Sequence, residues 1–208
     1  VSGPITKNYT YDAAGNPKSD GQTTFTWNAG GKLASTLRSG KIHTYKTNAF
    51  DQRISKHGPL SQRFFFFYDS TGQLIGEYRN NAETTTPTDD WLVRQETVWL
   101  GDIPVAVIKK PTATSPIQVH YVHADHLNTP RVIVNSRNTT IWRWDNVHAF
   151  GANLPFEDPD NDGQTFEYNS RFPGQYFDKE TNLHYNYFRY YEPETGRYIS
   201  PDPIGFAG

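Results

Sequence analysis

The sequence contains no cysteine and no methionine. Without cysteine, the chain can have no disulfide framework, no zinc–thiolate site and no cysteine nucleophile. A natural chain normally starts with methionine, whereas this one starts with Val1. We therefore expect it to be a piece of a longer protein.

The sequence also lacks an excess of charge of one sign and lacks long apolar runs. The chain has 20 Lys and Arg against 22 Asp and Glu, a formal net charge of -2, and the two signs are interspersed. This balance argues against nucleic acid or an anionic membrane surface as a partner. No apolar stretch approaches the roughly 20 residues of a membrane span. There is also no basic start followed by an apolar segment, as in a signal peptide.

Aromatic residues, in contrast, are abundant, with 13 Tyr, 13 Phe and 5 Trp. Such side chains suit the half-buried surface of a pleated sheet. Short strand-like runs separated by Gly, Asn, Asp and Pro recur along the chain, and the stretch most compatible with helical turns is Tyr121–Pro130. These features predict an all-β fold.

A short pattern recurs in the first half of the chain. An aromatic residue is followed by a turn rich in Asp, Asn and Gly, and then by an aliphatic residue that starts the next strand; the four copies are Tyr11–Pro17, Trp27–Leu33, Tyr45–Ile54 and Tyr68–Ile75. The pattern predicts a strand, a tight turn with positive φ, and a returning strand. One hairpin cannot bury its aromatic face alone, so we expect stacked antiparallel hairpins in a long sheet, with a β-sandwich as the alternative.

Several segments carry more local expectations. Arg63–Asp69 has apolar side chains on both faces and should be buried on both or covered by a neighbour. Leu183–Tyr191 alternates as one strand, with Tyr185, Tyr187, Arg189 and Tyr191 on one face. Asn80–Asp90 and Lys109–Ser115 are polar and rich in Thr and Pro, which is typical of surface loops.

The C-terminal stretch predicts a hairpin with a four-residue loop, Pro193–Gly196, because Pro presets φ and Gly closes the turn. In this register Glu192 faces Arg197, and counting outward places Arg189 opposite Ser200. Asp202 then lies two residues further along the same face.

Asp202 would therefore be diagonal to Arg189, at about 7–8 Å between Cβ atoms, which an arginine side chain can span. Pro201 and Pro203 have no amide hydrogen, so the ladder should end there and leave the carboxylate on irregular backbone. A structural ion pair with an Asx-type turn at Asp202 is the simplest interpretation of such a pair.

Two further groups resemble ligand sites. Asp158, Asp160 and Asp162, followed by Gly163, imitate the start of a calcium loop, but position 12 is Asn169 and no flanking helices are evident. We expect a solvated acidic turn there.

The other group is His123, Asp125 and His126, which lacks a third ligand on the same face. It fits a polar turn that satisfies backbone groups. No nucleophile elbow or phosphate loop is present, and no cofactor is expected.

From Tyr121 onward the motifs become specific. The stretches Tyr121–Val134, Trp142–Gly151 and Arg171–Gly208 resemble the bacterial RHS/YD-repeat family, and the upstream Tyr-Asp units resemble its tyrosine–aspartate repeats. The resemblance implies a shell segment over residues 1–120. Residues 121–208 would be the RHS signature and a truncated RHS-repeat-associated core.

In that family the β-sheet strip winds into a hollow shell around a toxic C-terminal region. The associated core plugs one end and cleaves the chain by an aspartic-protease-like reaction. The resemblance therefore implies a bacterial polymorphic toxin, made in the cytoplasm and secreted, as in type VI secretion systems or insecticidal toxin complexes. Its partners would be the rest of the shell, the toxin domain, and a secretion apparatus or adaptor.

The resemblance also assigns the self-cleavage residues. Arg189 and Asp202 match the arginine and the first aspartate of the motif, while the second aspartate and the cut site would lie beyond Gly208. Glu192 stands where the family usually has aspartate, and we expect little effect because this residue opens a turn. The fragment by itself is expected to be inactive.

Two other functions remain open. An extracellular β-rich module that binds carbohydrate or protein should leave several Tyr and Trp side chains exposed in a groove, whereas a shell should bury most of them. A free-standing effector enzyme should cleave an added substrate, and we expect that this chain does not.

Overall fold

All regular structure in the described residues, 7–60, 62–80, 91–112 and 114–204 of a computed structural model, is β-strand, which confirms the predicted all-β class. Thirteen strands form one sheet: β1 (Thr10–Tyr11), β2 (Pro17–Ser19), β3 (Thr23–Trp27), β4 (Leu33–Arg38), β5 (Lys41–Thr47), β6 (Arg53–His57), β7 (Arg63–Tyr68), β8 (Leu74–Asn80), β9 (Trp91–Leu100), β10 (Ile103–Lys109), β11 (Gln118–Ala124), β12 (Pro130–Val134) and β13 (Thr140–Arg143). A second sheet has four strands: β14 (Tyr176–Asp178), β15 (Leu183–Asn186), β16 (Arg189–Glu192) and β17 (Arg197–Tyr198). No described helix is long and apolar enough to cross a bilayer.

The first sheet is a row of hairpins in which each strand pairs with the next in the sequence. A repeated turn explains this order. In the first turn, Asp12 Oδ1 accepts the backbone N–H groups of Ala14 and Asn16, and Gly15 takes a φ of 85°. The same two bonds recur at five further carboxylates or amides: Asn28, Asn48, Asp69, Asp125 and Asn135. Each side chain thus satisfies donors that the turn would otherwise leave unpaired.

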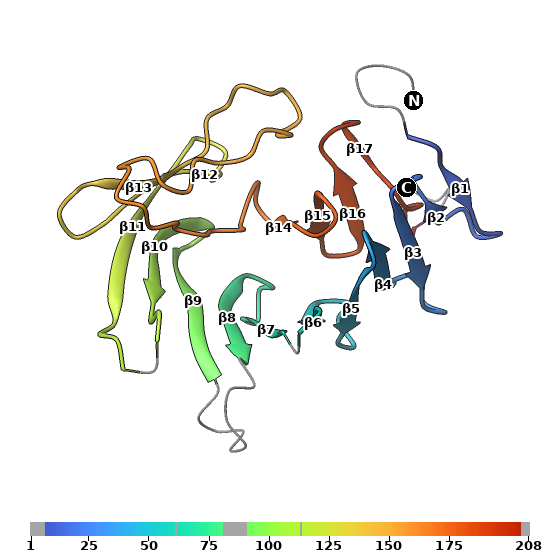
Figure 1. The fold of residues 1–208 in the computed structure, drawn as a ribbon, viewed down its shortest axis with the longest axis horizontal. Coiled ribbons are helices and arrows are strands. Elements are labelled where there is room, and N and C mark those ends of the chain that lie inside the picture. Colours follow the sequence, from blue (N-terminus) through green and yellow to red (C-terminus); the bar gives the residue numbers. More distant parts are fainter. Residues whose placement is uncertain (1–6, 61, 81–90, 113, 205–208) are drawn as a thin grey trace.

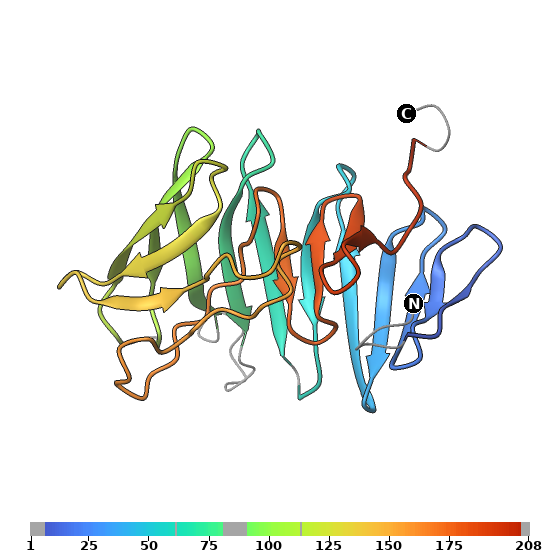
Figure 2. The ribbon, with the colours of Figure 1, turned by 90° about the horizontal axis from the view of Figure 1, so that it is seen from above.

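The hairpin strip is curved, and the second sheet lies in its concavity (Figure 1). Seen from above, the strands stand side by side as a wall with β14–β17 against it (Figure 2). The two sheets share an aromatic core, formed by Phe25, Leu33, Tyr45 and Phe66 from the first sheet and Tyr176, Leu183, Tyr185 and Tyr190 from the second. The hairpins therefore bury an aromatic part of their concave face against the second sheet.

A second core lies at the other end of the strip. The segment between β13 and β14 returns across the concave side of the last strands (Figure 1). Tyr168 from this segment packs on Trp142 with ring centroids 5.4 Å apart. Val107, Val122, Ile133 and Trp144 complete the cluster.

The structure corrects two of the strand predictions. Arg63–Tyr68 forms β7, but only one face is buried: Phe66 is 3% exposed and Phe67 is 53% exposed. Leu183–Tyr191 is not one strand but a hairpin that turns at Tyr187 and Phe188, with Asn186 paired to Arg189. Alternation alone cannot distinguish a long strand from two short strands joined by a two-residue turn.

The local predictions for the connecting segments have mixed outcomes. Tyr121–Pro130 contains no helical turn, because β11 extends to Ala124 and a β-turn follows. The predicted loop at Lys109–Ser115 begins where β10 ends, and its residue 113 lies outside the described residues. The predicted loop at Asn80–Asp90 lies outside them except for Asn80, which ends β8.

A histidine buried in the second sheet makes the stability of the fold sensitive to acid. His184 is 2% exposed, and burial together with the nearby Arg171 cation lowers its pKa to about 3. Because the unfolded chain binds this proton near pH 6.5, the contribution of His184 is complete above that pH and is lost below it. We expect His184 to account for a fall of about 2 kcal/mol in the free energy of unfolding between pH 6.5 and pH 5.

Urea unfolding across this pH range measures the effect. A His184→Leu variant should lose this part of the pH dependence, whereas a variant of the exposed His126, His126→Leu, should keep it. Equal pH dependence in the wild type and in His184→Leu would contradict the assignment.

Candidate functional site

The structure brings the two predicted site residues together. Arg189 begins β16, and its Nη1 lies 2.9 Å from Asp202 Oδ2. The guanidinium also stacks on the ring of Tyr198, 3.7 Å from the centroid, while Asn186 Nδ2 donates to the Tyr198 hydroxyl at 2.6 Å. The expected neighbours on one strand face, Tyr185 and Tyr187, are displaced by the turn, so Tyr198 takes their place beside the arginine. Arg189 is thus held by a ring and a carboxylate together.

The predicted register of the last hairpin is confirmed. Glu192 pairs with Arg197, and Tyr191 pairs with Tyr198. One more backbone bond follows, from Ile199 N to Tyr190 O at 3.0 Å. The ladder therefore ends before the prolines that flank Asp202, as their missing amide hydrogens require.

Asp202 combines an ion pair with a turn. Its Oδ2 meets Arg189, and its Oδ1 accepts the backbone N–H of Ile204 at 3.2 Å. The side chains of Asp202 and Arg189 are 37% and 28% exposed, so a further chain segment can approach the carboxylate. Among the described residues, Asp202 is the only carboxylate within 4.0 Å of Arg189. Their catalytic role stays a prediction.

The segment before Asp202 packs on the first turn of the strip. A Cβ added at Gly15 would lie 3.2 Å from Cγ of Pro201, so glycine at this position leaves room for the close approach. The end of the second sheet thereby reaches the beginning of the first.

Glu192 has a larger structural role than the sequence indicates. It is 2% exposed, and its carboxylate accepts hydrogen bonds from Lys7 Nζ at 2.6 Å, from the Tyr9 hydroxyl at 2.5 Å and from Thr195 Oγ1 at 2.5 Å. Burial alone would raise the pKa of Glu192, but these partners hold it below its usual value. Glu192 therefore does more than open a turn, while the effect of glutamate in place of the family's aspartate stays a prediction. The Glu192 side chain connects β16 to Lys7 near the start of the chain. No local sequence pattern predicts a contact between residues so far apart in the sequence.

Sequence reasoning also missed a buried ion pair between the sheets. Arg53 on β6 is 1% exposed, and its Nη1 lies 2.5 Å from Oδ2 of the fully buried Asp178 on β14. Lys56 Nζ approaches the other carboxylate oxygen at 3.1 Å. Burial disfavours the ionised Asp178, but the two cations outweigh it and lower the pKa of Asp178.

Aromatic rings surround this ion pair. The guanidinium carbon of Arg53 lies 4.4–5.6 Å from the centroids of four rings, those of Tyr45, Phe66, Tyr176 and Tyr185. The cluster therefore joins both sheets through charge and aromatic contact at once.

The carboxylates of the acidic turn at residues 158–164 accept hydrogen bonds from backbone N–H groups of the same turn. Asp158, Asp160 and Asp162 bring carboxylate oxygens within 4.8 Å of one another. Asp158 accepts the N–H groups of Asp162 and Gly163, and Asp162 accepts that of Gln164. Asn169, at calcium-loop position 12, is 4% exposed and donates to the Tyr176 hydroxyl. The carboxylates thus stabilise a turn, and the position of Asn169 does not favour a calcium loop.

The histidine-rich stretch has the predicted turn geometry. Asp125 caps the turn between β11 and β12 and pairs with Arg131, whose Nε lies 2.8 Å from its Oδ2. His126 is exposed. This arrangement fits the expected polar turn.

Comparison with known proteins finds relatives that are named as bacterial toxins. No protein-family model matches the chain. It is 30% identical to double-stranded DNA deaminase toxin A of Burkholderia cenocepacia over 167 residues, which is 77% of this chain and 11% of that protein. It is 39% identical to toxin protein Tse5 of Pseudomonas aeruginosa over 97 residues, which is 46% of this chain and 7% of that protein.

A solved structure shares the fold. The Photorhabdus luminescens Tc holotoxin pore superposes with a TM-score of 0.65 at 19% identity, covering 94% of this chain and 9% of that one. The chain spans between 7% and 47% of the length of the curated relatives it matches.

Proposed function

The chain is a segment of an RHS/YD-repeat protein, and from that premise we propose that it forms part of a shell that encloses a toxic C-terminal domain of its parent. The second sheet closes this shell as a plug. The parent is a secreted bacterial toxin, and its toxic domain is released by self-cleavage with Asp202 and Arg189 at the site. The partners are the remaining shell, the toxic domain and a secretion apparatus or adaptor.

The packing of β14–β17 into the concave face of a 13-stranded hairpin strip carries this proposal. A curved strip of this kind can line a container. Within the described residues, β1 pairs only with β2. Its other edge offers backbone groups to which a preceding hairpin can add. Each added hairpin would lengthen the wall.

We also propose a division into two regions, whose boundary falls within β11. Residues 1–120 supply wall hairpins, and residues 121–208 supply the signature and core. The signature completes the strip through β11–β13, and the core turns inward as β14–β17. This division is part of the proposal.

The chemistry proposed for Asp202 requires a second carboxylate. Two carboxyl groups that share one proton can activate water and protonate the leaving amine of a peptide bond. Asp202 would be one of them, and the second would come from the parent chain after Gly208. Arg189 would orient Asp202 through the ion pair between the two side chains.

The alternative of a carbohydrate-binding module lacks support from the four tryptophans whose side chains the structure describes. Trp27, Trp99 and Trp144 are partly or fully buried, and each donates its indole N–H to a backbone carbonyl. Trp142 is fully buried in the second core. None of these four rings is exposed, so they stabilise the sheet and do not form the exposed aromatic groove expected of such a module.

Expression of the parent with its native C-terminus tests the proposal. We expect two fragments on a denaturing gel that elute together in size-exclusion chromatography, with the toxic fragment resistant to added protease. A single uncut band whose C-terminal region is degraded readily would contradict both enclosure and self-cleavage.

A further inference from the structure

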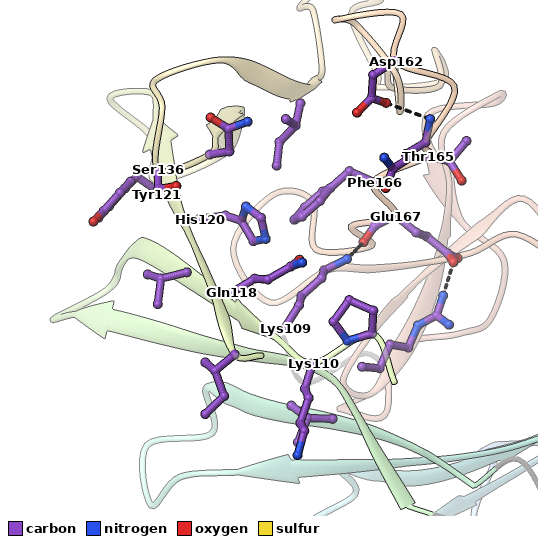
Figure 3. A pocket seen from close by; sticks show the side chains of 18 of the residues that line it. Lys109, Lys110, Gln118, His120, Tyr121, Ser136, Asp162, Thr165, Phe166 and Glu167 are labelled. Atoms are coloured by element: carbon purple, nitrogen blue, oxygen red, sulfur yellow. Dashed lines mark hydrogen bonds and ion pairs between the residues drawn. The ribbon is translucent and has the colours of Figure 1, made fainter. Parts of the chain in front are cut away.

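A cleft of about 830 Å³ lies on the concave side of the strip, between β9–β11 and residues 160–167. Figure 3 shows Lys109, His120 and Phe166 close together within it. His120 is two residues before Val122 on β11, and Val122 belongs to the core that Tyr168 covers. The cleft therefore opens on the same side as the second sheet.

The cleft has more cations than its own carboxylates neutralise. Arg94 is paired with Glu77 and Glu167. Within the described ranges, the other four basic residues of the lining have no ion-pair partner; they are Arg79, Lys109, Lys110 and Arg137. Such a group of cations in a concave site attracts an anion.

Lys109 is placed to hold that anion. Its ammonium lies 3.8 Å from the centroid of Phe166 and donates to the Glu167 carbonyl at 2.5 Å. An ammonium has three N–H donors, so two remain for a ligand. Burial, followed by the nearby Arg94 cation, lowers the pKa of Lys109 to about 8.

His120 supplies a second polar group without a partner. It is 8% exposed, and neither ring nitrogen has a hydrogen-bond partner in the described part of the chain. Its ring meets Phe166 edge-on at 4.8 Å. Burial lowers the pKa of His120 to about 4, so the ring is neutral near pH 7 and carries one N–H. Leaving a buried donor unpaired is unfavourable, and a bound acceptor relieves the cost.

The remaining lining distinguishes between kinds of anion. Ile117, Val119 and Ile141 supply apolar surface beside the cations. Asp160 and Asp162 also line the cleft and would repel a dense polyanion. Apolar surface next to separate cations fits a polypeptide that alternates acidic and apolar side chains better than it fits a nucleic acid.

We propose that this cleft binds an acidic segment of polypeptide, with a carboxylate received by Lys109 and His120. The identity of the natural ligand rests on the proposed function: the segment available on this side of the wall is the enclosed chain. The binding chemistry itself depends only on the cleft.

The test uses the isolated chain and a fluorescein-labelled peptide of alternating glutamate and leucine, followed by fluorescence anisotropy. We expect saturable binding that Lys109→Gln weakens about 10- to 100-fold, the range of a lost charge-assisted hydrogen bond. His120→Phe keeps an aromatic ring but removes the two ring nitrogens, and it should weaken binding about 2- to 10-fold. Lys41→Gln, at an exposed lysine on β5, is the matched control and should leave binding unchanged. Unaltered denaturation midpoints confirm that the variants fold.

The pH dependence adds an independent readout. The charged groups around Lys109 are Arg94, Glu77, Glu167 and Glu157, and the neutral His120 lies beside it. Between pH 7 and pH 9 Arg94 stays protonated, Glu167 stays ionised and His120 stays neutral, because their pKa values lie well outside this range. The glutamates of the peptide also stay ionised. Affinity should therefore fall above pH 8 by up to about tenfold per pH unit, as Lys109 loses its proton. Lys109→Arg should still bind and should lose this dependence, because arginine stays charged.

Equal affinity of Lys109→Gln and the wild type would overturn the proposal, and so would tighter binding of an oligothymidylate of the same charge. Absence of binding to the wild type would also overturn it. None of these outcomes depends on self-cleavage of the parent, so failure of the shell proposal and failure of the cleft proposal are distinguishable.

Discussion

A parent protein that carries Asp202→Asn is expected to remain uncut. Asparagine preserves the shape of the side chain but cannot accept or deliver the proton, and loss of a general acid–base group slows reactions about 10²- to 10⁴-fold. We therefore expect cleavage at least about 100-fold slower than in the wild type. The fraction cleaved, followed on a denaturing gel against time after synthesis, measures the effect.

Arg189→Ala should also slow cleavage, through a different route. It removes the ion pair with Asp202 and the stacking on Tyr198, so the carboxylate loses its orientation. A matched control is Asp145→Asn, because Asp145 forms an exposed ion pair with Arg143 that is also 2.9 Å long. That variant should cleave at the wild-type rate. If Asp202→Asn and Arg189→Ala also cleave at that rate, the assignment of the site is wrong.

The Asp178→Ala variant should lose much of the stability of the fold. Without the carboxylate, Arg53 and Lys56 would remain buried between the sheets with no compensating charge from Asp178. Breaking a buried ion pair on one side costs about 3–5 kcal/mol, and we expect a loss of this size in the free energy of unfolding. Urea unfolding followed by tryptophan fluorescence measures it.

The adjacent residue provides the control for this prediction. Lys179 forms an exposed ion pair with Glu157, and its side chain is 45% exposed. Lys179→Ala should therefore change stability by at most about 1 kcal/mol. The double replacement Arg53→Met and Asp178→Leu should cost less than Asp178→Ala, because no charge remains unpaired at this pair. A loss below 1 kcal/mol in Asp178→Ala would contradict the role given to the cluster.

The hairpin arrangement could be predicted because its determinants are local. At Asp12 and Asp69 a carboxylate, followed three residues later by glycine, fixes the turn through bonds within the same few residues. The register of the last hairpin likewise follows from Pro193 and Gly196, which allowed Arg189 and Asp202 to be placed near each other. Turns of this kind are determined by the residue types within the turn itself.

The remaining features depend on distant parts of the chain. Tyr187 takes a positive φ of 51° although it is neither glycine nor asparagine. Its hydroxyl donates a hydrogen bond to the backbone carbonyl of Gly72. The partners of Asp178 and Glu192 are the early residues Arg53 and Lys7. No local pattern pairs such residues, because contacts between the two sheets form only when the strip curves.

The proposed function requires the second sheet to lie inside a container whose wall the first sheet continues. The uncleaved Asp202→Asn parent, examined by electron cryomicroscopy at a resolution that traces strands, tests this most directly. We predict that a preceding hairpin extends the sheet beyond β1, and that the C-terminal region lies on the same side of the wall as β14–β17. A C-terminal region on the convex side, or a β1 edge open to solvent, would contradict it.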